Sequence, residues 1–205
     1  MITDWFDDDP LFNRYYPDNP DYRHYFENEW GIPIHNDVHL FELLSLVGFA
    51  AGLNWQVVLN KRQSFDAAFA HWNINQVAQM TPLTIAELLR NPTIIRNARK
   101  IGAVIHNANV VRRLIRQYGS FDQYLWHQIH YQQLVLSVEH LRDLPRQTAI
   151  SKQLSKQMQA DGFQFAGAIT IQAWLVTTGL ITARRDHRGI IKAKNVRQIT
   201  DERLY

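Results

Sequence analysis

The stretch Gly162-Phe163-Gln164-Phe165-Ala166-Gly167 lies between two segments of helical periodicity. The first begins at Ser151 and is ended by Asp161-Gly162, and the second runs from Ala168 to Thr178 with Gly179 as its C-cap. Glycine permits the positive backbone φ of a tight turn, and the second helix presents unpaired N–H groups and its positive dipole end to an anion. The spacing predicts a helical hairpin that can grip phosphate, although many hairpins turn on glycine without a ligand.

Helical spacing continues outward from this hairpin over nearly the whole chain after residue 36. Asn36 or Asp37 caps an apolar segment that Gly52 can stop, and Asn91-Pro92 begins a predicted long helix that Gly119 ends. No stretch alternates apolar and polar residues as a half-buried strand does. We therefore predict an all-α fold with no sheet.

Length and composition fit one domain. The 205 residues, 46% of them hydrophobic and 20% charged, can build a substantial core. We expect a helical domain over residues 1–183, irregular and acidic in residues 1–35, followed by a basic tail over residues 184–205. No apolar run approaches the roughly 20 residues of a membrane span, and the N-terminus lacks the basic and apolar regions of a signal peptide. We expect a cytoplasmic monomer with no membrane partner.

The charge is unevenly distributed, although the net charge is only +3. Residues 1–42 hold ten acidic and two basic residues, a net −8, and residues 43–205 hold nine acidic and twenty basic residues, a net +11. Clustered Lys and Arg displace counterions from a phosphate backbone, which favours a polyanionic partner. The alternative is a solvated basic surface with the acidic segment folded against it.

Two further constellations and the cysteine count bear on chemistry. Tyr22, Tyr25, Trp30 and Trp55 either fill the core or form a slot in which flat rings sandwich a nucleobase. His35-x-x-x-His39-x-x-Glu42 has helical spacing for a metal site, but His35 precedes the expected helix cap, so we predict no metal there. The absence of cysteine excludes disulfides, thiolate nucleophiles and sulfur-ligated zinc.

Nine short motifs follow one another between residues 22 and 182. They are YFENEWGIP (25–33), LFELL (40–44), GFAAGLNW (48–55), KR (61–62), IIRNARKI (94–101), YLW (124–126), LSK (154–156), GFQFAG (162–167) and TGL (178–180). In this order they resemble the bacterial 3-methyladenine DNA glycosylase I family.

The resemblance implies a helix-hairpin-helix repair protein that flips a methylated adenine out of double-stranded DNA and cuts its N-glycosidic bond with water. The aromatic residues named above would stack the positively charged base, which cation–π attraction favours over normal adenine. Gly52 and Leu53 would fill the gap left by the flipped nucleotide. The residues expected to contact DNA are Gly52, Leu53, Arg96, Lys100, Gly162 and Gly167.

Two departures from the family pattern matter. The family has a glutamate, which reads the base and supports catalysis, where this chain has Val47, and Glu29 is a possible replacement. The family typically joins its termini with a zinc ion on two cysteines and two histidines. Here Thr3 and Phe26 occupy two of those positions, so we expect no cofactor, and packing of Trp5, Phe6 or Phe12 in place of the zinc.

The sequence leaves three functions open. The first is a glycosylase for 3-methyladenine or a related alkylated purine. The second is a protein that binds DNA or a modified base without cutting, because valine at position 47 can neither accept a hydrogen bond nor stabilise a cationic transition state. The third is a helical scaffold, which the retained aromatic slot argues against.

Overall fold

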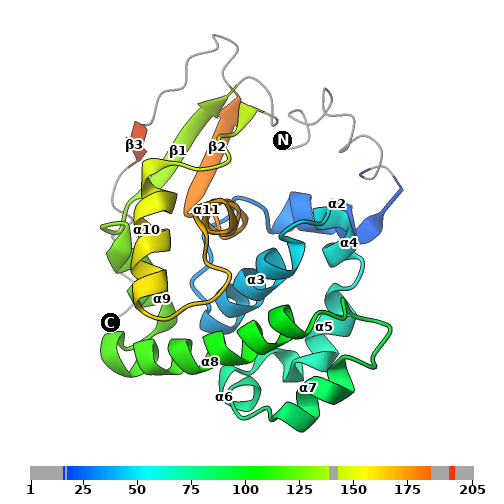
Figure 1. Cartoon of the computed structure of the whole chain (residues 1–205). Helices are drawn as coiled ribbons and strands as arrows, with labels where there is room; N and C mark the ends of the chain where they lie inside the picture. The colour runs from blue at the N-terminus through cyan, green and yellow to red at the C-terminus, as the bar shows by residue number, and fades with distance from the viewer. Residues whose placement is uncertain (1–15, 17, 139–142, 186–193, 197–205) are drawn as a thin grey trace.

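The computed structural model describes residues 16, 18–138, 143–185 and 194–196, and helices make up most of this part (Figure 1). The fold is therefore helical, as predicted. The helices are α2 (Pro20–Asn28), α3 (Asp37–Ala50), α4 (Trp55–Leu59), α5 (Arg62–Ala68), the short 3-10 turn η2 (Ala70–Trp72), α6 (Ile74–Val77), α7 (Pro82–Leu88), α8 (Ala98–Tyr118), α9 (Phe121–Gln128), α10 (Ala149–Ala160) and α11 (Ala168–Thr177).

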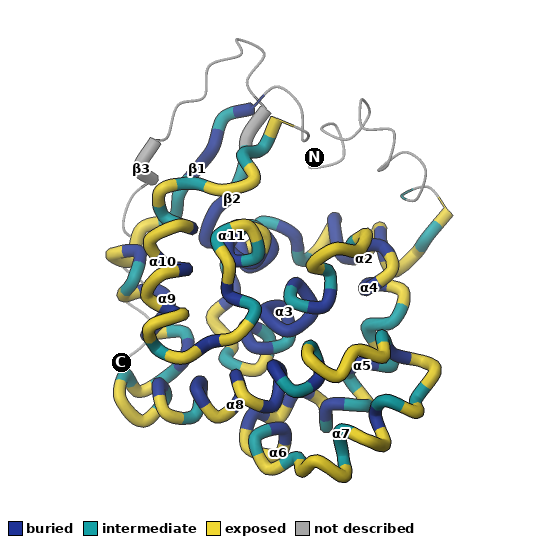
Figure 2. The backbone as a smooth tube through the Cα atoms, in the orientation of Figure 1, coloured by how far each residue is buried: buried dark blue, intermediate teal, exposed yellow. Residues whose placement is uncertain are grey.

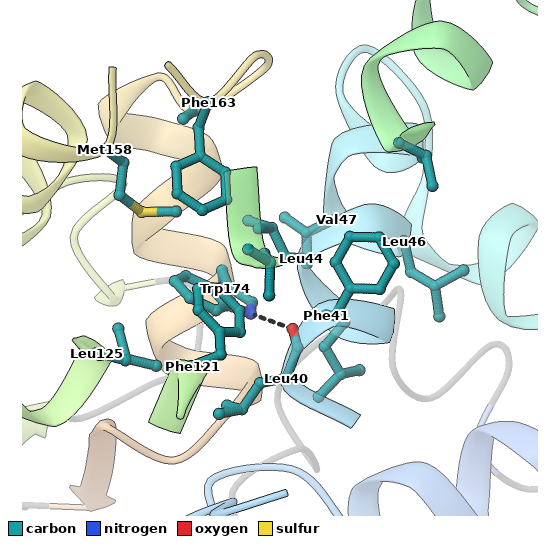
Figure 3. Packing of buried hydrophobic residues seen from close by; sticks show 14 of the residues in the cluster. Leu40, Phe41, Leu44, Leu46, Val47, Phe121, Leu125, Met158, Phe163 and Trp174 are labelled. Carbon is teal, nitrogen blue, oxygen red and sulfur yellow. Dashed lines mark hydrogen bonds between the residues drawn. The ribbon is translucent and has the colours of Figure 1, made fainter. Parts of the chain in front are cut away.

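Helix α3 is the central element and is buried along most of its length (Figure 2). From Leu40 to Phe49 it is apolar except at Glu42, Ser45 and Gly48, because α4, α8, α9 and α11 pack around it. Asn36 caps it as predicted, accepting a hydrogen bond from the His39 N–H at 3.0 Å. Trp174 on α11 donates from Nε1 to the Leu40 carbonyl oxygen at 3.0 Å (Figure 3). This bond fixes α11 against α3, the two helices that share the site described below.

The longest helix, α8, starts later than predicted. Its N-cap is Asn97, whose side chain accepts from the Lys100 N–H at 3.1 Å, and it ends at Gly119 as expected. Asn91 instead accepts from the Thr93 N–H at 2.9 Å and closes a short turn. An Asn-Pro pair can form either a helix cap or a turn, and in this chain Asn91-Pro92 forms a turn.

Three strands contradict the prediction of a sheet-free fold. They are β1 (Gln133–Val138), β2 (Ile181–Arg185) and β3 (Lys194–Val196), in the order β2-β1-β3. β1 runs parallel to β2 and antiparallel to β3. Its buried residues do not alternate with exposed ones, and such short apolar runs cannot be distinguished from helix by periodicity. The helical class stands, with this small sheet added.

The described parts of segments 1–35 and 184–205 contain regular secondary structure that we did not expect. Helix α2 lies inside the segment 1–35 that we predicted to be irregular, and Asn19 caps it by accepting from the Tyr22 N–H at 2.9 Å. Part of the predicted tail 184–205 belongs to β2 and β3. The expectations for Thr3, Trp5, Phe6 and Phe12 fall outside the described residues.

The loop after α2 is fastened to the end of α11. The Ile34 N–H donates to the Thr178 carbonyl oxygen at 3.1 Å. Gly179 has φ +72°, and a Cβ there would lie 2.2 Å from the main-chain carbon of Ile32, so only glycine fits. These two contacts hold the loop that follows Trp30 at a fixed distance from the end of α11. Within the described part of the chain, no helix is both long and apolar enough to cross a bilayer.

Candidate functional site

A mostly apolar pocket of about 310 Å³ opens between α2, α3, the start of α4 and α11. Aromatic rings, small aliphatic side chains and a few polar groups form its walls. The lining residues are Tyr25, Phe26, Trp30, Val47, Ala50, Leu53, Trp55, Leu144, Pro145, Gln172, Ala173, Val176 and Thr177. Its size is within the usual range for small-molecule sites.

The pocket unites three of the four aromatic residues predicted to bind a base. Tyr25 and Trp55 have ring centroids 5.5 Å apart, and Trp30 lies 5.9 Å from Phe26. Tyr22 packs on Phe26 at 4.7 Å and is not among the lining residues, so it supports the wall from behind. Phe26 also lines the pocket, although the sequence did not lead us to include it among the base-binding residues. We had considered it only as the residue at the position of a zinc-binding histidine in the family.

The turn between α3 and α4 carries the exposed edge of the pocket. The Leu53 N–H donates to the Ala50 carbonyl oxygen at 2.8 Å, and the Leu53 side chain is 47% exposed. Lys100 Nζ donates to the carbonyl oxygens of Phe49 at 2.8 Å and Ala51 at 2.7 Å. A cation at the C-terminal end of a helix satisfies carbonyls that have no intrahelical partner. Lys100, predicted to contact DNA, thus uses its ammonium group to hold this turn.

The described lining of the pocket contains no carboxylate. Val47 lines the pocket with an apolar side chain. Glu29 belongs to an ion-pair cluster outside the lining, where Arg62 Nη1 lies 2.8 Å from each of its oxygens. Burial raises the pKa of Glu29, but the hydrogen bonds and charges of His39 and Arg62 outweigh burial and hold that pKa below its ordinary value. Glu29 is therefore ionised, and its carboxylate is bound to Arg62 within the cluster.

The same cluster accounts for the histidine pattern. Arg62 also binds Glu42, with Nε 2.7 Å from Oε1, and His39 Nε2 lies 3.4 Å from Glu29. His35 is elsewhere, with Nδ1 3.0 Å from Asp122 and its ring stacked on Trp126. Among the described residues, no group of three or more His, Cys, Asp or Glu side chains is arranged to hold a metal ion.

Three lining residues have buried polar atoms without a hydrogen-bond partner. They are Tyr25 Oη, Trp55 Nε1 and Gln172 Nε2. Burial, and next the negative charge of Glu29, raises the pKa of the Tyr25 hydroxyl well above its ordinary value, so the group keeps its proton. Sequence reasoning missed Gln172. The feature of the sequence that could have indicated Gln172 is its polar amide within the otherwise mostly apolar segment 168–177.

The predicted glycine hairpin is present between α10 and α11. Gly162 has φ +96°, and Gly167 is the N-cap of α11 without a side-chain cap. Asn107 on α8 clamps the hairpin, donating to the Gln164 carbonyl oxygen at 3.0 Å and accepting from the Gln164 N–H at 2.8 Å. His106 Nε2 bonds the Gly162 carbonyl oxygen at 2.8 Å. The hairpin is thus rigidly seated on α8.

An open groove follows the hairpin along the start of α8. Its lining includes Arg99 and Gln164, together with Ala98, Gly102, His106 and Phe165. Arg96 is exposed just before α8. Basic side chains and a glycine hairpin therefore share one surface.

Comparison with known proteins gives the same family along most of the chain. The methyladenine glycosylase family model matches residues 15–188. The DNA-3-methyladenine glycosylase of Haemophilus influenzae is 34% identical over 160 residues, which cover 78% of this chain and 86% of that protein. DNA-3-methyladenine glycosylase 1 of Escherichia coli is 31% identical over 177 residues, which cover 86% of this chain and 89% of that protein.

Solved structures agree. A variant of 3-methyladenine DNA glycosylase I in complex with 3-methyladenine superposes with a TM-score of 0.77 at 32% identity, covering 80% of this chain and 88% of that chain. The 3-methyladenine DNA glycosylase I of Staphylococcus aureus gives a TM-score of 0.76 at 32% identity, covering 80% and 87%. With sequence, fold and helical hairpin in agreement over most of its length, the chain belongs to the methyladenine glycosylase family.

Proposed function

We propose that this protein is a DNA glycosylase that takes a base extruded from double-stranded DNA into the aromatic pocket and hydrolyses its N-glycosidic bond. The observation that carries the proposal is the pocket itself, in which Tyr25 and Trp55 bring two flat rings together against α11, the helix that follows the glycine hairpin. Its relatives are named for 3-methyladenine, and we propose this or a related alkylated purine as the substrate.

DNA would lie across the hairpin and the start of α8. Gly162 and Gly167 shape a turn whose backbone can approach phosphates. Arg99, which lines the groove next to the hairpin, and the exposed Arg96 just before α8 would bind the DNA backbone. Gly52 and Leu53 would fill the space that the flipped nucleotide leaves. Lys100 contributes by holding that turn through Phe49 and Ala51.

The chemistry rests on the leaving group more than on the protein. A 3-alkylated adenine carries a positive charge in DNA, so the bond to the sugar is already weak. In the hydrolysis, the bond between C1′ and the base nitrogen breaks with its electrons going to the base, and water supplies the new C1′–O bond and loses a proton. No carboxylate belongs to the described lining of the pocket, so the aromatic faces stabilise the bound base by cation–π and stacking contacts.

The missing carboxylate favours a second candidate, a protein that binds the flipped base without releasing it. Val47 stands in the wall where an anion would stabilise the cationic transition state, and Glu29 is engaged by Arg62. Binding would then serve recognition of the lesion alone.

One assay separates the two candidates. The protein is incubated with methylated duplex DNA, and released 3-methyladenine is measured beside Val47→Glu, Trp55→Ala and the exposed control Tyr131→Ala. We expect release by the natural protein and no change in the control. In Trp55→Ala we expect a loss of about fivefold or more, since stacking is worth about 1–3 kcal/mol per base. No release by the natural protein, together with robust release by Val47→Glu, would favour the binding candidate.

A further inference from the structure

The aromatic rings that α2 contributes to the pocket are packed separately from the main hydrophobic core. The buried rings of segment 22–30 form a cluster of their own with Leu59 of α4. Trp55, at the start of α4, packs against both this cluster and the main core. Helix α2 lies beside α4 (Figure 1). The spacing between the α2 rings and Trp55 therefore depends on how α2 is joined to α4 and to the residues that follow it.

Two polar contacts make this connection, one at each end of α2. At its start, Asn19 Nδ2 donates to Oδ1 of Asn60, the C-cap of α4, at 3.1 Å. At its end, the C-cap residue Glu29 accepts from Nη1 of Arg62, the first residue of α5, at 2.8 Å to each carboxylate oxygen. The side chains of Glu29 and Arg62 are only 13% and 22% exposed, so salt and water screen this second contact less than a surface pair.

The guanidinium of Arg62 is itself held in place by the central helix α3. Nε donates to Glu42 Oε1 at 2.7 Å and Nη2 donates to Oε2 at 3.2 Å, a bidentate pairing that fixes the plane of the group. Nη1 is then directed at Glu29. A lysine ammonium is a point charge and lacks this planar fork, so Arg62 joins α2, α3 and α5 in a way that lysine does not.

The carboxylate that Arg62 holds is directly connected to two residues of the pocket wall. The N–H groups of Glu29 and Trp30 both donate to the Tyr25 carbonyl oxygen at 2.9 Å. The loop beyond Trp30 is fastened to α11, as described above, which fixes the distance from the α2 segment to that helix. Arg62 acts on the other distance, between the α2 segment and Trp55, whose ring centroid lies 5.5 Å from that of Tyr25.

We propose that Arg62 is a positioning residue for base binding, because its contact with Glu29 sets the spacing between the rings of Tyr25 and Trp30 on one side and Trp55 on the other. This inference rests on the proposed function, since it concerns the same pocket. Arg62 does not line the pocket. Its effect on the base is indirect, through the distance between rings, and a gap of about 0.5–1 Å forfeits a quarter to a half of the attraction between contacting atoms.

The first test measures the affinity of the protein for free 3-methyladenine by calorimetry. The variants are Arg62→Met and Glu29→Ala, and the controls are Arg23→Met and Glu27→Ala, which break an ion pair of 3.5 Å within α2. We expect both variants to bind about tenfold more weakly, within the range that stacking on one ring contributes, and the controls to bind as the natural protein does. Affinity for undamaged duplex DNA should be the same in all five proteins, which shows that each is folded.

A double-mutant cycle separates positioning from a general structural role. In a Trp55→Ala background one of the rings to be spaced is absent, so adding Arg62→Met should change base affinity by no more than about twofold, the scatter of independent effects. Binding stays measurable there because Tyr25 and Trp30 remain. If Arg62→Met does not fold, Glu29→Ala completes the same cycle, since it leaves Arg62 paired with Glu42.

Two results would overturn the inference. One is natural base affinity in the folded variants of Arg62 and Glu29, and the other is a tenfold loss that persists in the Trp55→Ala background. Failure of the proposed function gives a different result, because then the natural protein does not bind the base, or Trp55→Ala alone leaves its affinity unchanged.

Discussion

The ammonium group of Lys100 lies 2.7 Å from the carbonyl oxygen of Ala51 and 2.8 Å from that of Phe49. This contact joins the first turn of α8 to the end of α3. The turn that follows α3 carries Leu53 and leads into Trp55, so Lys100 links the start of α8 to the pocket.

Lys100→Met should weaken base excision without removing a phosphate contact. We expect excision to fall several-fold because the turn loses its support, while the slope of log affinity against log salt stays unchanged. Each phosphate contact contributes about 0.9 to that slope, so a titration between low and moderate salt resolves it. Lys152→Met, an exposed lysine on α10, is the control. A slope reduced by about one in Lys100→Met would instead support the sequence-based prediction that Lys100 contacts DNA.

Asn107→Ala should unseat the glycine hairpin. Both Gln164 main-chain groups lose their partner, and we expect the free energy of unfolding to fall by about 2 kcal/mol, together with weaker DNA binding. Urea denaturation and DNA titration measure the two effects. Asn109→Ala, also on α8, is a matched control, because it removes a bond to the Ala78 carbonyl oxygen at the end of α6, away from the hairpin. Equal losses of DNA affinity in both variants would contradict a specific role for the clamp.

Local capping rules and the family resemblance predicted most of the fold. Asn36 and Gly119 act at the helix ends where the sequence placed them, because each side-chain or backbone preference works within a few residues. The sheet escaped prediction, since β1 pairs with β2 across about 46 residues, as Leu134 with Ile181 shows. Such pairing depends on how α10 and α11 pack, which periodicity does not record.

Only part of the candidate site could be predicted, because the rest depends on contacts between segments that are far apart in the sequence. Tyr25, Trp30 and Trp55 were found from motifs, and the structure brings them into one pocket. The environment of Lys100 and the unpartnered amide of Gln172 depend on contacts between distant elements. Only the packed structure shows that Thr148 takes one half of that amide and leaves the other half without a partner.

Acid should destabilise the protein partly through Glu29. Its pKa in the folded state lies below the ordinary value of 4.5, so the contribution of Glu29 to stability is complete above about pH 4.5 and is lost as the pH falls through the folded-state pKa. Glu29→Gln should therefore lower stability at neutral pH and flatten its decline between neutral and acidic pH. Thermal unfolding over that range measures both effects. An equally steep decline in Glu29→Gln would assign the acid sensitivity to other carboxylates.

Leu53→Ala should separate flipping of the base from its recognition. Leu53 is exposed at the mouth of the pocket, and its side chain would fill the gap in the duplex once the base has left the stack. We expect excision from duplex DNA to fall about tenfold, equivalent to about 1.4 kcal/mol, because the open duplex loses a stacking partner. Affinity for the free base should change little, since the aromatic walls remain. Leu83→Ala, on the more exposed Leu83 of α7, is the control. A loss of free-base affinity as large as the loss of excision would place Leu53 in the base-binding wall and remove its role in the duplex.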